Sequence, residues 1–144
     1  MFYTKDLVVK TSHTKDNPLE HKLKCWAGRI EHIGMFARPG AAGTIRLQFW
    51  LGGHQIYPEE PGTYFIPTQY PLRFIDEQQL KVGENEIIAK LWNVGAKYPH
   101  TITIELGIVP ERETLKSQIK ILKRAINNQT YAILQQMKRI NVKK

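Results

Sequence analysis

The chain has 144 residues, of which 42% are hydrophobic and 24% charged, and its net charge is +8. This length suits one domain with an appendage, and the composition is that of an ordinary globular protein. The sequence contains no run of about 18 apolar residues, which excludes a membrane-spanning helix. Cys25 is the single cysteine, which excludes an intrachain disulfide.

The N-terminal stretch MFYTKDLVVK has no apolar run long enough for a signal peptide, so none is expected. Residues 7–10 within it predict a first strand. Residues 23–28 predict a second strand because small or apolar side chains recur at every second position. The alternation changes phase at Gly28 and resumes over residues 30–36, so we expect a bulge or bend at this glycine.

The next strands are separated by clear turn signals. Residues 44–51 alternate cleanly, and Gly52-Gly53 predicts a tight turn that returns residues 54–57 as a hairpin partner. A second turn is expected at residues 81–85, which contain Gly83 and Asn85. Further strands are predicted at residues 63–66, 72–75, 86–93 and 101–109.

About eight short strands with no helix between them are typical of an antiparallel sandwich or jelly roll. We therefore predict a mainly β fold: a single antiparallel, jelly-roll-like β-sandwich over residues 1–110, followed by one long C-terminal amphipathic helix over residues 111–144.

The segment Leu72 to Ile88 reads LRFIDEQQLKVGENEII. It resembles the strand, connection and "Leu-Lys-x-Gly-Glu-Asn-x-Ile" entry common in galactose-binding-like jelly-roll sandwiches. The resemblance covers some 20 residues and implies the fold. It implies no ligand residues, because such modules carry them in variable loops.

The segment from Pro110 to Lys144 predicts a single helix. Pro110 suits a helix start, and acidic Glu111 and Glu113 suit the positive N-terminal end. Its apolar residues fall within a stripe about 60° wide, which is closer to a coiled-coil seam than to a broad globular face. Gln129 and Gln136 interrupt this stripe. The apolar stripe consists of Leu115, Ile119, Leu122, Ile126, Ile133, Met137 and Ile140.

This segment also carries +7 of the net charge of +8, from nine Lys or Arg against two Glu. Three uses of the helix stay open: folding back on its own domain, self-association, or contact with nucleic acid or an anionic membrane surface. The residues expected to contact an anionic partner are Lys116, Lys120, Lys123, Arg124, Lys138, Arg139, Lys143 and Lys144.

No catalytic, metal or cofactor site is predicted. Neither of the two serines has a nucleophile-elbow context, and Cys25 alternates with core positions. None of the five histidines has metal-ligand spacing with another His or with Cys. The adjacent acidic pairs Glu59-Glu60 and Asp76-Glu77 lie in connections, where neighbouring side chains point apart.

Three aromatic residues, Trp26, Trp50 and Tyr57, can point away from the apolar face of their strands. Exposed aromatic side chains serve as anchors of protein interfaces, and on a sandwich face they can also stack on sugar rings. Trp92 lies in a nearly continuous apolar run and is expected in the core.

The sequence thus favours a non-enzymatic structural protein. We expect a subunit of a homo-oligomeric assembly, such as a virion-type capsid, cement or spike-base component, whose basic helix contacts neighbouring subunits or an anionic partner. The location expected is a virion or a cytoplasmic assembly. The alternative is a carbohydrate-binding or adhesin-like module that uses its exposed aromatics.

Overall fold

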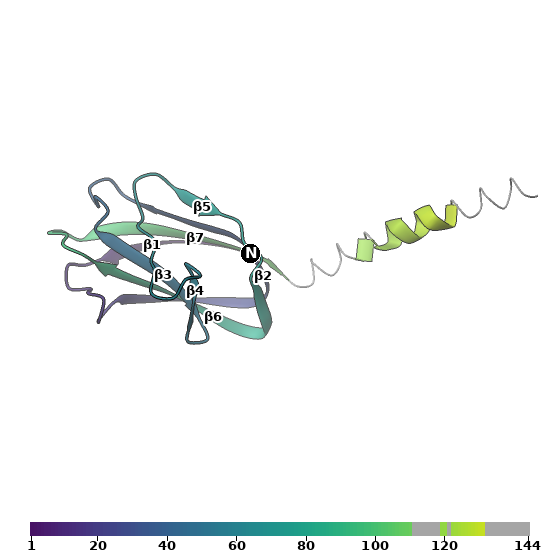
Figure 1. Ribbon diagram of the computed structural model, residues 1–144, viewed down its shortest axis with the longest axis horizontal. Coiled ribbons are helices and arrows are strands. Elements are labelled where there is room, and N and C mark those ends of the chain that lie inside the picture. The colour runs from purple at the N-terminus through teal and green to yellow at the C-terminus, as the bar shows by residue number, and fades with distance from the viewer. Residues whose placement is uncertain (111–118, 121, 132–144) are drawn as a thin grey trace, which may run out of the picture. The chain divides into compact units, whose positions relative to one another are not determined.

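The computed structural model describes residues 1–110, 119–120 and 122–131, without the side chains of 82–84. The chain separates into two compact units, Met1–Pro110 and Glu111–Lys144, which we call the body and the arm. The body is built of β-strands and the described part of the arm is helical, so the protein is mainly β with a C-terminal helix (Figure 1).

Every strand pair in the body is antiparallel. The hydrogen-bonded order is β1-β7-β2-β6-β3-β4, and β5 pairs with β2 beside this path. The seven strands are β1 (Phe2–Val9), β2 (Leu19–Ala37), β3 (Ile45–Leu51), β4 (His54–Tyr57), β5 (Leu72–Phe74), β6 (Gln79–Asn93) and β7 (His100–Pro110).

The long strand β2 joins two sets of neighbours. Its first half pairs with β6, its second half pairs with β7, and Gly28 lies at the change with partners Leu80 and Pro110. A Cβ at this glycine would lie 2.3 Å from the carbonyl oxygen of Val109. Glycine is therefore required here for the close approach of β7, and the predicted irregularity at Gly28 is confirmed by the register shift between Trp26 and Gly28.

One hydrophobic cluster fills the body. The strands contribute alternate side chains, as the period of two requires. Its largest fully buried members include Phe49 of β3, Ile33 and Met35 of β2, Leu91 of β6 and Ile104 of β7. Because both halves of β2 contribute to this cluster, the two sets of strands share one core.

Three sequence predictions need correction. The two segments predicted on either side of Gly28 form the single strand β2, because pairing continues through the irregularity. Residues 63–66 contribute one isolated bridge, Leu47 to Phe65, in place of a strand. Residues 81–85, predicted as a turn, lie inside β6. Trp26 pairs with Glu84 and Gly28 pairs with Leu80, so β6 has more residues than β2 between these two pairs. The extra residues form an irregularity in the ladder and do not reverse the chain.

In the arm, residues 119–120 and 122–131 are helical. Part of the predicted long helix is thus observed, and the remainder of its range, 111–118, 121 and 132–144, lies outside the described residues.

Candidate interaction surfaces

The described helix exposes its apolar side chains. Ile119, Leu122 and Ile126 are 51%, 61% and 59% exposed, and they follow one another at spacings of three and four. Residues at these spacings lie on one face of a helix. These three members of the predicted stripe therefore form an apolar face. The other members, Leu115, Ile133, Met137 and Ile140, lie outside the described residues.

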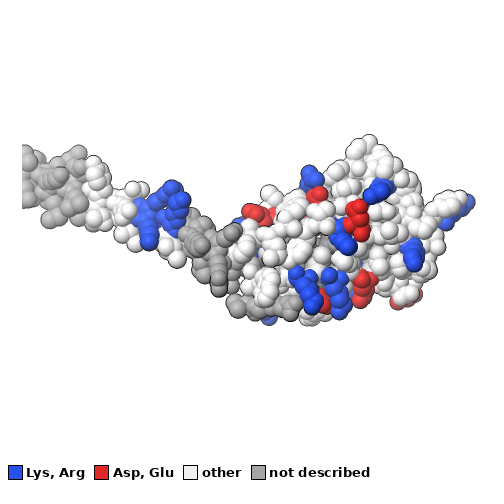
Figure 2. All heavy atoms as spheres, turned by 180° about the vertical axis from the view of Figure 1, so that it is seen from behind, with Lys and Arg blue, Asp and Glu red and all other residues white. Residues whose placement is uncertain are grey.

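Lys120, Lys123 and Arg124 are exposed in the same helix. Figure 2 shows Lys and Arg without Asp or Glu on the described helix, whereas both signs of charge are interspersed on the body face in view. The described helix is therefore basic, whereas the body face in view carries both positive and negative side chains. The other basic residues predicted for an anionic partner, Lys116, Lys138, Arg139, Lys143 and Lys144, lie outside the described residues.

The aromatic residues singled out from the sequence have different environments. Trp26 is 66% exposed. Trp50 is half-buried, its Nε1 donates to Oε1 of Gln48 at 3.2 Å, and the ammonium of Lys90 lies 4.6 Å from its ring centroid. Both tryptophans therefore lie on the surface of the body, but only Trp50 is held in place by polar neighbours among the described contacts.

The expectation that Tyr57 is exposed is wrong. Its side chain is 4% exposed and packs edge-on against Phe49 and Phe74, with ring centroids 6.4 and 5.7 Å away. Its hydroxyl donates to Oδ2 of Asp76. Burial, and then the hydrogen bond to Asp76, raise the pKa of Tyr57. The hairpin β3–β4 turns this residue inward, so it belongs to the core cluster.

Sequence reasoning missed a second aromatic group. Trp92 is 5% exposed as expected, but it lies outside the core cluster and packs edge-on against Tyr64 with ring centroids 5.7 Å apart. The guanidinium of Arg46 lies 5.0 Å from the centroid of Tyr64. The sequence contains one sign that Trp92 lies on the other side of the sheet from the core. It directly follows Leu91, and adjacent residues of a strand face opposite sides.

Cys25 lies in the core, as predicted, with 1% exposure. Burial raises the pKa of its thiol to about 11. At neutral pH this thiol is protonated, and a protonated, buried thiol is a poor nucleophile. Among the described side chains, no three His, Cys, Asp or Glu residues gather closely enough to hold a metal ion.

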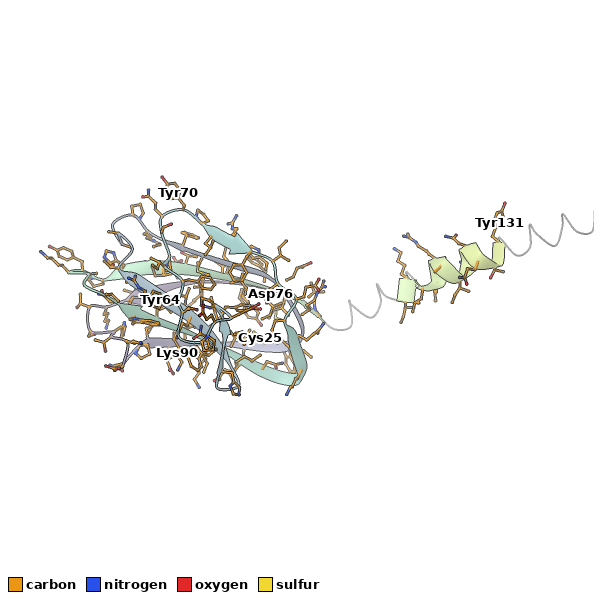
Figure 3. All side chains as sticks on the ribbon, viewed as in Figure 1. Cys25, Tyr64, Tyr70, Asp76, Lys90 and Tyr131 are labelled. Atoms are coloured by element: carbon orange, nitrogen blue, oxygen red, sulfur yellow. The ribbon has the colours of Figure 1, made fainter. Side chains whose placement is uncertain are left out.

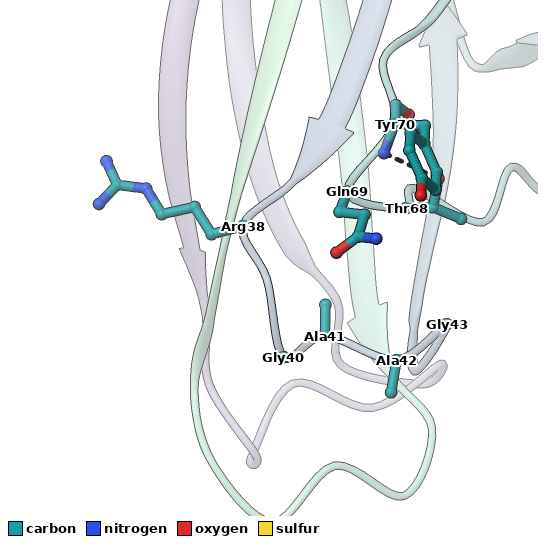
Figure 4. Close-up of a pocket in the computed structure, with 8 residues that line it drawn as sticks. All are labelled: Arg38, Gly40, Ala41, Ala42, Gly43, Thr68, Gln69 and Tyr70. Atoms are coloured by element: carbon teal, nitrogen blue, oxygen red, sulfur yellow. Dashed lines mark hydrogen bonds between the residues drawn. The ribbon is translucent and has the colours of Figure 1, made fainter.

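The loop between β2 and β3 encloses a surface pocket of about 470 Å³ with residues 68–70. Figure 4 shows Gln69 directed toward this pocket and the Arg38 side chain directed away from it. Gly40, Ala42 and Gly43 have positive φ, and Tyr70 is 74% exposed. Small side chains and backbone line most of this pocket, so it presents few groups that could select a ligand.

Comparisons of the chain with protein-family models, curated proteins and solved structures find no match. The helical residues that the structure describes are also too few and too polar to cross a membrane. The geometry of the arm and of the body therefore carries the functional argument.

Proposed function

We propose that this chain is a non-enzymatic structural subunit that assembles with copies of itself through its C-terminal helix. The observation that carries this proposal is the exposed apolar face formed by Ile119, Leu122 and Ile126. Burying one such side chain fully contributes about 1.5–3 kcal/mol. Isolated helices are marginal in water, so packing of this face against a partner helix would also stabilise the helix itself.

A second copy of the same helix suits this face. If Ile119, Ile126 and Ile133 occupy the a positions of a heptad repeat, then the d positions fall at Leu115, Leu122, Gln129 and Gln136. In parallel coiled coils, β-branched residues at a with leucine at d favour two strands, and the two polar residues in the seam cost stability but can fix the register.

The charges that flank this seam permit parallel pairing. In the same heptad, Glu111 would take a g position and Lys116 of the other copy the e position beside it, which is a pair of opposite charge. The next three g–e pairs contain no like charges, and the like-charged pair falls at the C-terminal end. These later pairs are Gln118–Lys123, Ala125–Thr130, Ala132–Met137 and finally Arg139–Lys144.

The basic residues outside the seam remain available to another partner. Lys120 and Arg124 take the b and f positions, which point away from the seam of a coiled coil. They suit non-specific contact with an anionic surface, such as packaged nucleic acid or an anionic membrane. A small β body with a basic helical arm is a format suited to a virion-type capsid, cement or spike-base subunit.

For the body we propose the two-layer, jelly-roll-like sandwich implied by the resemblance over residues 72–88. Support comes from the core cluster, to which the strands on both sides of β2 contribute.

The test is the native mass of the full-length protein, measured by light scattering at low and high salt. We expect a discrete, salt-resistant oligomer, because apolar burial is insensitive to screening. Ile126→Lys should convert it to a monomer. Asn128→Lys adds the same charge on the opposite side of the helix and should leave the mass unchanged.

A chain ending at Pro110 provides a second test. All members of the core cluster belong to the body, so this truncated chain should keep its thermal unfolding transition and become monomeric. A truncated chain that still forms the full-length oligomer would show that the arm is not the connector. A full-length monomer would remove the self-assembly proposal.

A further inference from the structure

The outward side of β3 and β6 has an unusual composition for a solvent-facing sheet surface. Ile87, Ala89 and Leu91 of β6 point into the core, so Lys90 and Trp92 point outward. On β3, Arg46 pairs with Trp92 and Gln48 pairs with Lys90 in the ladder. Outward faces are usually polar, yet this one contains Trp50 and Trp92 among its charged residues.

Two loops build walls over this face. The first wall is the connection after β4, from which Tyr64 packs on Trp92. Thr63 of the same connection accepts a hydrogen bond at its backbone carbonyl from Nε2 of Gln48, at 2.6 Å. From the connection between β1 and β2, the carbonyl of His13 accepts a bond from the amide of Asn93 at 2.8 Å. Both walls are therefore attached to the sheet by hydrogen bonds, and the surface between them is preorganised.

Two hollows of about 350 and 260 Å³ lie on this face. The larger lies against the β1–β2 loop, and the smaller is lined by residues of both loops, Lys15 and Tyr64. Both hollows are lined by Lys15 and Trp92, so they adjoin, and we call the pair of hollows the β3–β6 cleft. Figure 3 labels Tyr64 and Lys90, which line different hollows of this cleft. Its principal residues are Lys15, Glu20, Trp50, Tyr64, Lys90 and Trp92.

Cations hold the aromatic rings of the cleft in place. The ammonium of Lys90 lies 4.6 Å from the centroid of Trp50 and also pairs with Oε1 of Glu20 at 2.9 Å. The guanidinium of Arg46 lies 5.0 Å from the centroid of Tyr64. Cation–π contacts of this length are attractive, so the rings are oriented before a ligand arrives.

We propose that the β3–β6 cleft binds a neutral oligosaccharide. A sugar ring offers an apolar face, which suits the accessible rings of Trp50 and Tyr64. It also offers hydroxyl groups that both donate and accept hydrogen bonds. The cleft supplies donors from Lys15 and Lys90 and acceptors from Asp16 and Glu20 within the same hollow.

The mixture of charges argues against acidic ligands. A nucleic acid strand or an acidic peptide would meet the carboxylates of Asp16 and Glu20 as well as the lysines. Clefts for polyanions are dominated by cations, and their binding weakens steeply with salt. The two adjoining hollows, of about 350 and 260 Å³, favour a ligand of more than one ring over a single sugar. This proposal rests on the body alone and is independent of assembly by the arm.

The test uses the full-length protein and the change of tryptophan fluorescence on titration. The probes are neutral tetrasaccharides of glucose, mannose, galactose and N-acetylglucosamine, with tetragalacturonate and a thymidine decamer as acidic probes. At least one neutral probe should bind saturably at concentrations up to about 10 mM, which covers weak millimolar affinities. Its binding should be insensitive to salt.

Trp50→Ala should weaken that binding about tenfold or more, since central aromatic anchors dominate small-ligand and protein contacts alike. Trp26→Ala is the matched control, because Trp26 is an exposed tryptophan outside the cleft. Tyr64→Ala, at a side chain 42% exposed, gives a second test should the loss of Trp50 impair folding.

Three outcomes would overturn the proposal. They are the absence of saturable binding for every neutral probe, salt-sensitive binding of the acidic probes alone, and an equal loss of affinity in the Trp26→Ala and Trp50→Ala variants. A monomeric protein that still binds a neutral probe would contradict the assembly proposal and leave this one intact.

Discussion

The carboxylate of Glu105 lies directly over the backbone of Gly34, so that a Cβ on this glycine would be 2.6 Å from Oε2. The same carboxylate is held from two other sides. Nε of Arg73 donates to Oε2 at 3.2 Å, and Nε2 of His32 lies 3.4 Å from it. Because the Glu105 side chain is only 13% exposed, it has little room to move away. Glycine at position 34 thus leaves room for a side chain 71 residues away in the chain.

Gly34→Ala should therefore destabilise the protein by about 1–3 kcal/mol, the usual cost of overpacking. The added methyl group would displace Glu105 and weaken its contact with Arg73. The midpoint of urea unfolding, followed by circular dichroism, measures this loss. Thr4→Ala, at an exposed position opposite Glu105 in the β1–β7 ladder, is the control and should change the midpoint little. An unchanged midpoint for Gly34→Ala would show that Glu105 moves freely.

The buried hydroxyl of Tyr57 gives the next prediction. Tyr57→Phe removes the hydrogen bond to Asp76 while keeping the ring between Phe49 and Phe74, so we expect a loss of about 2 kcal/mol in unfolding free energy. Tyr57→Ala also creates a cavity and should cost about 3–5 kcal/mol.

Tyr98→Phe serves as the matched control for this pair, because the side chain of Tyr98 is 72% exposed. Its unfolding midpoint in urea should equal that of the unmodified chain. Equal midpoints for Tyr57→Phe and Tyr98→Phe would contradict the assigned contribution of the Tyr57–Asp76 bond.

The thiol of Cys25 predicts a loss of stability at alkaline pH. Its pKa rises from 9.0 to about 11 in the folded protein because burial disfavours the thiolate. Between these values the unfolded chain binds fewer protons than the folded one, so the free energy of unfolding falls as pH rises from about 9 to about 11. Tyr57, whose pKa is also raised by burial, acts in the same direction.

Urea unfolding at pH values from 8 to 11 (about half-unit steps) measures this slope. Cys25→Ala should reduce the slope, although it also lowers stability at every pH by removing a buried side chain. An identical slope in the two proteins would exclude Cys25 as the titrating group. In addition, the thiol should react with a disulfide reagent at neutral pH only when the protein is unfolded.

The mainly β character, most strand positions and the irregularity at Gly28 could be predicted from the sequence. These features depend on the alternation of side chains, on turn residues and on glycine where two backbones come close together. Each of these is a pattern among residues that are neighbours in the sequence. The same holds for the helix at residues 119–120 and 122–131, whose 3–4 spacing is a local pattern.

The accessibility of the outward-facing aromatic residues, and their neighbours, depend on the three-dimensional packing of distant segments. Tyr57 was expected on the surface, but the β3–β4 hairpin turns it into the core, and Trp92 is covered by Tyr64 from a loop 28 residues away. Alternation assigns a side chain to one of two faces of a strand, but it cannot say which loop crosses that face. The β3–β6 cleft and the contact of Glu105 with Gly34 therefore arise from pairings between distant strands and loops, which no local pattern contains.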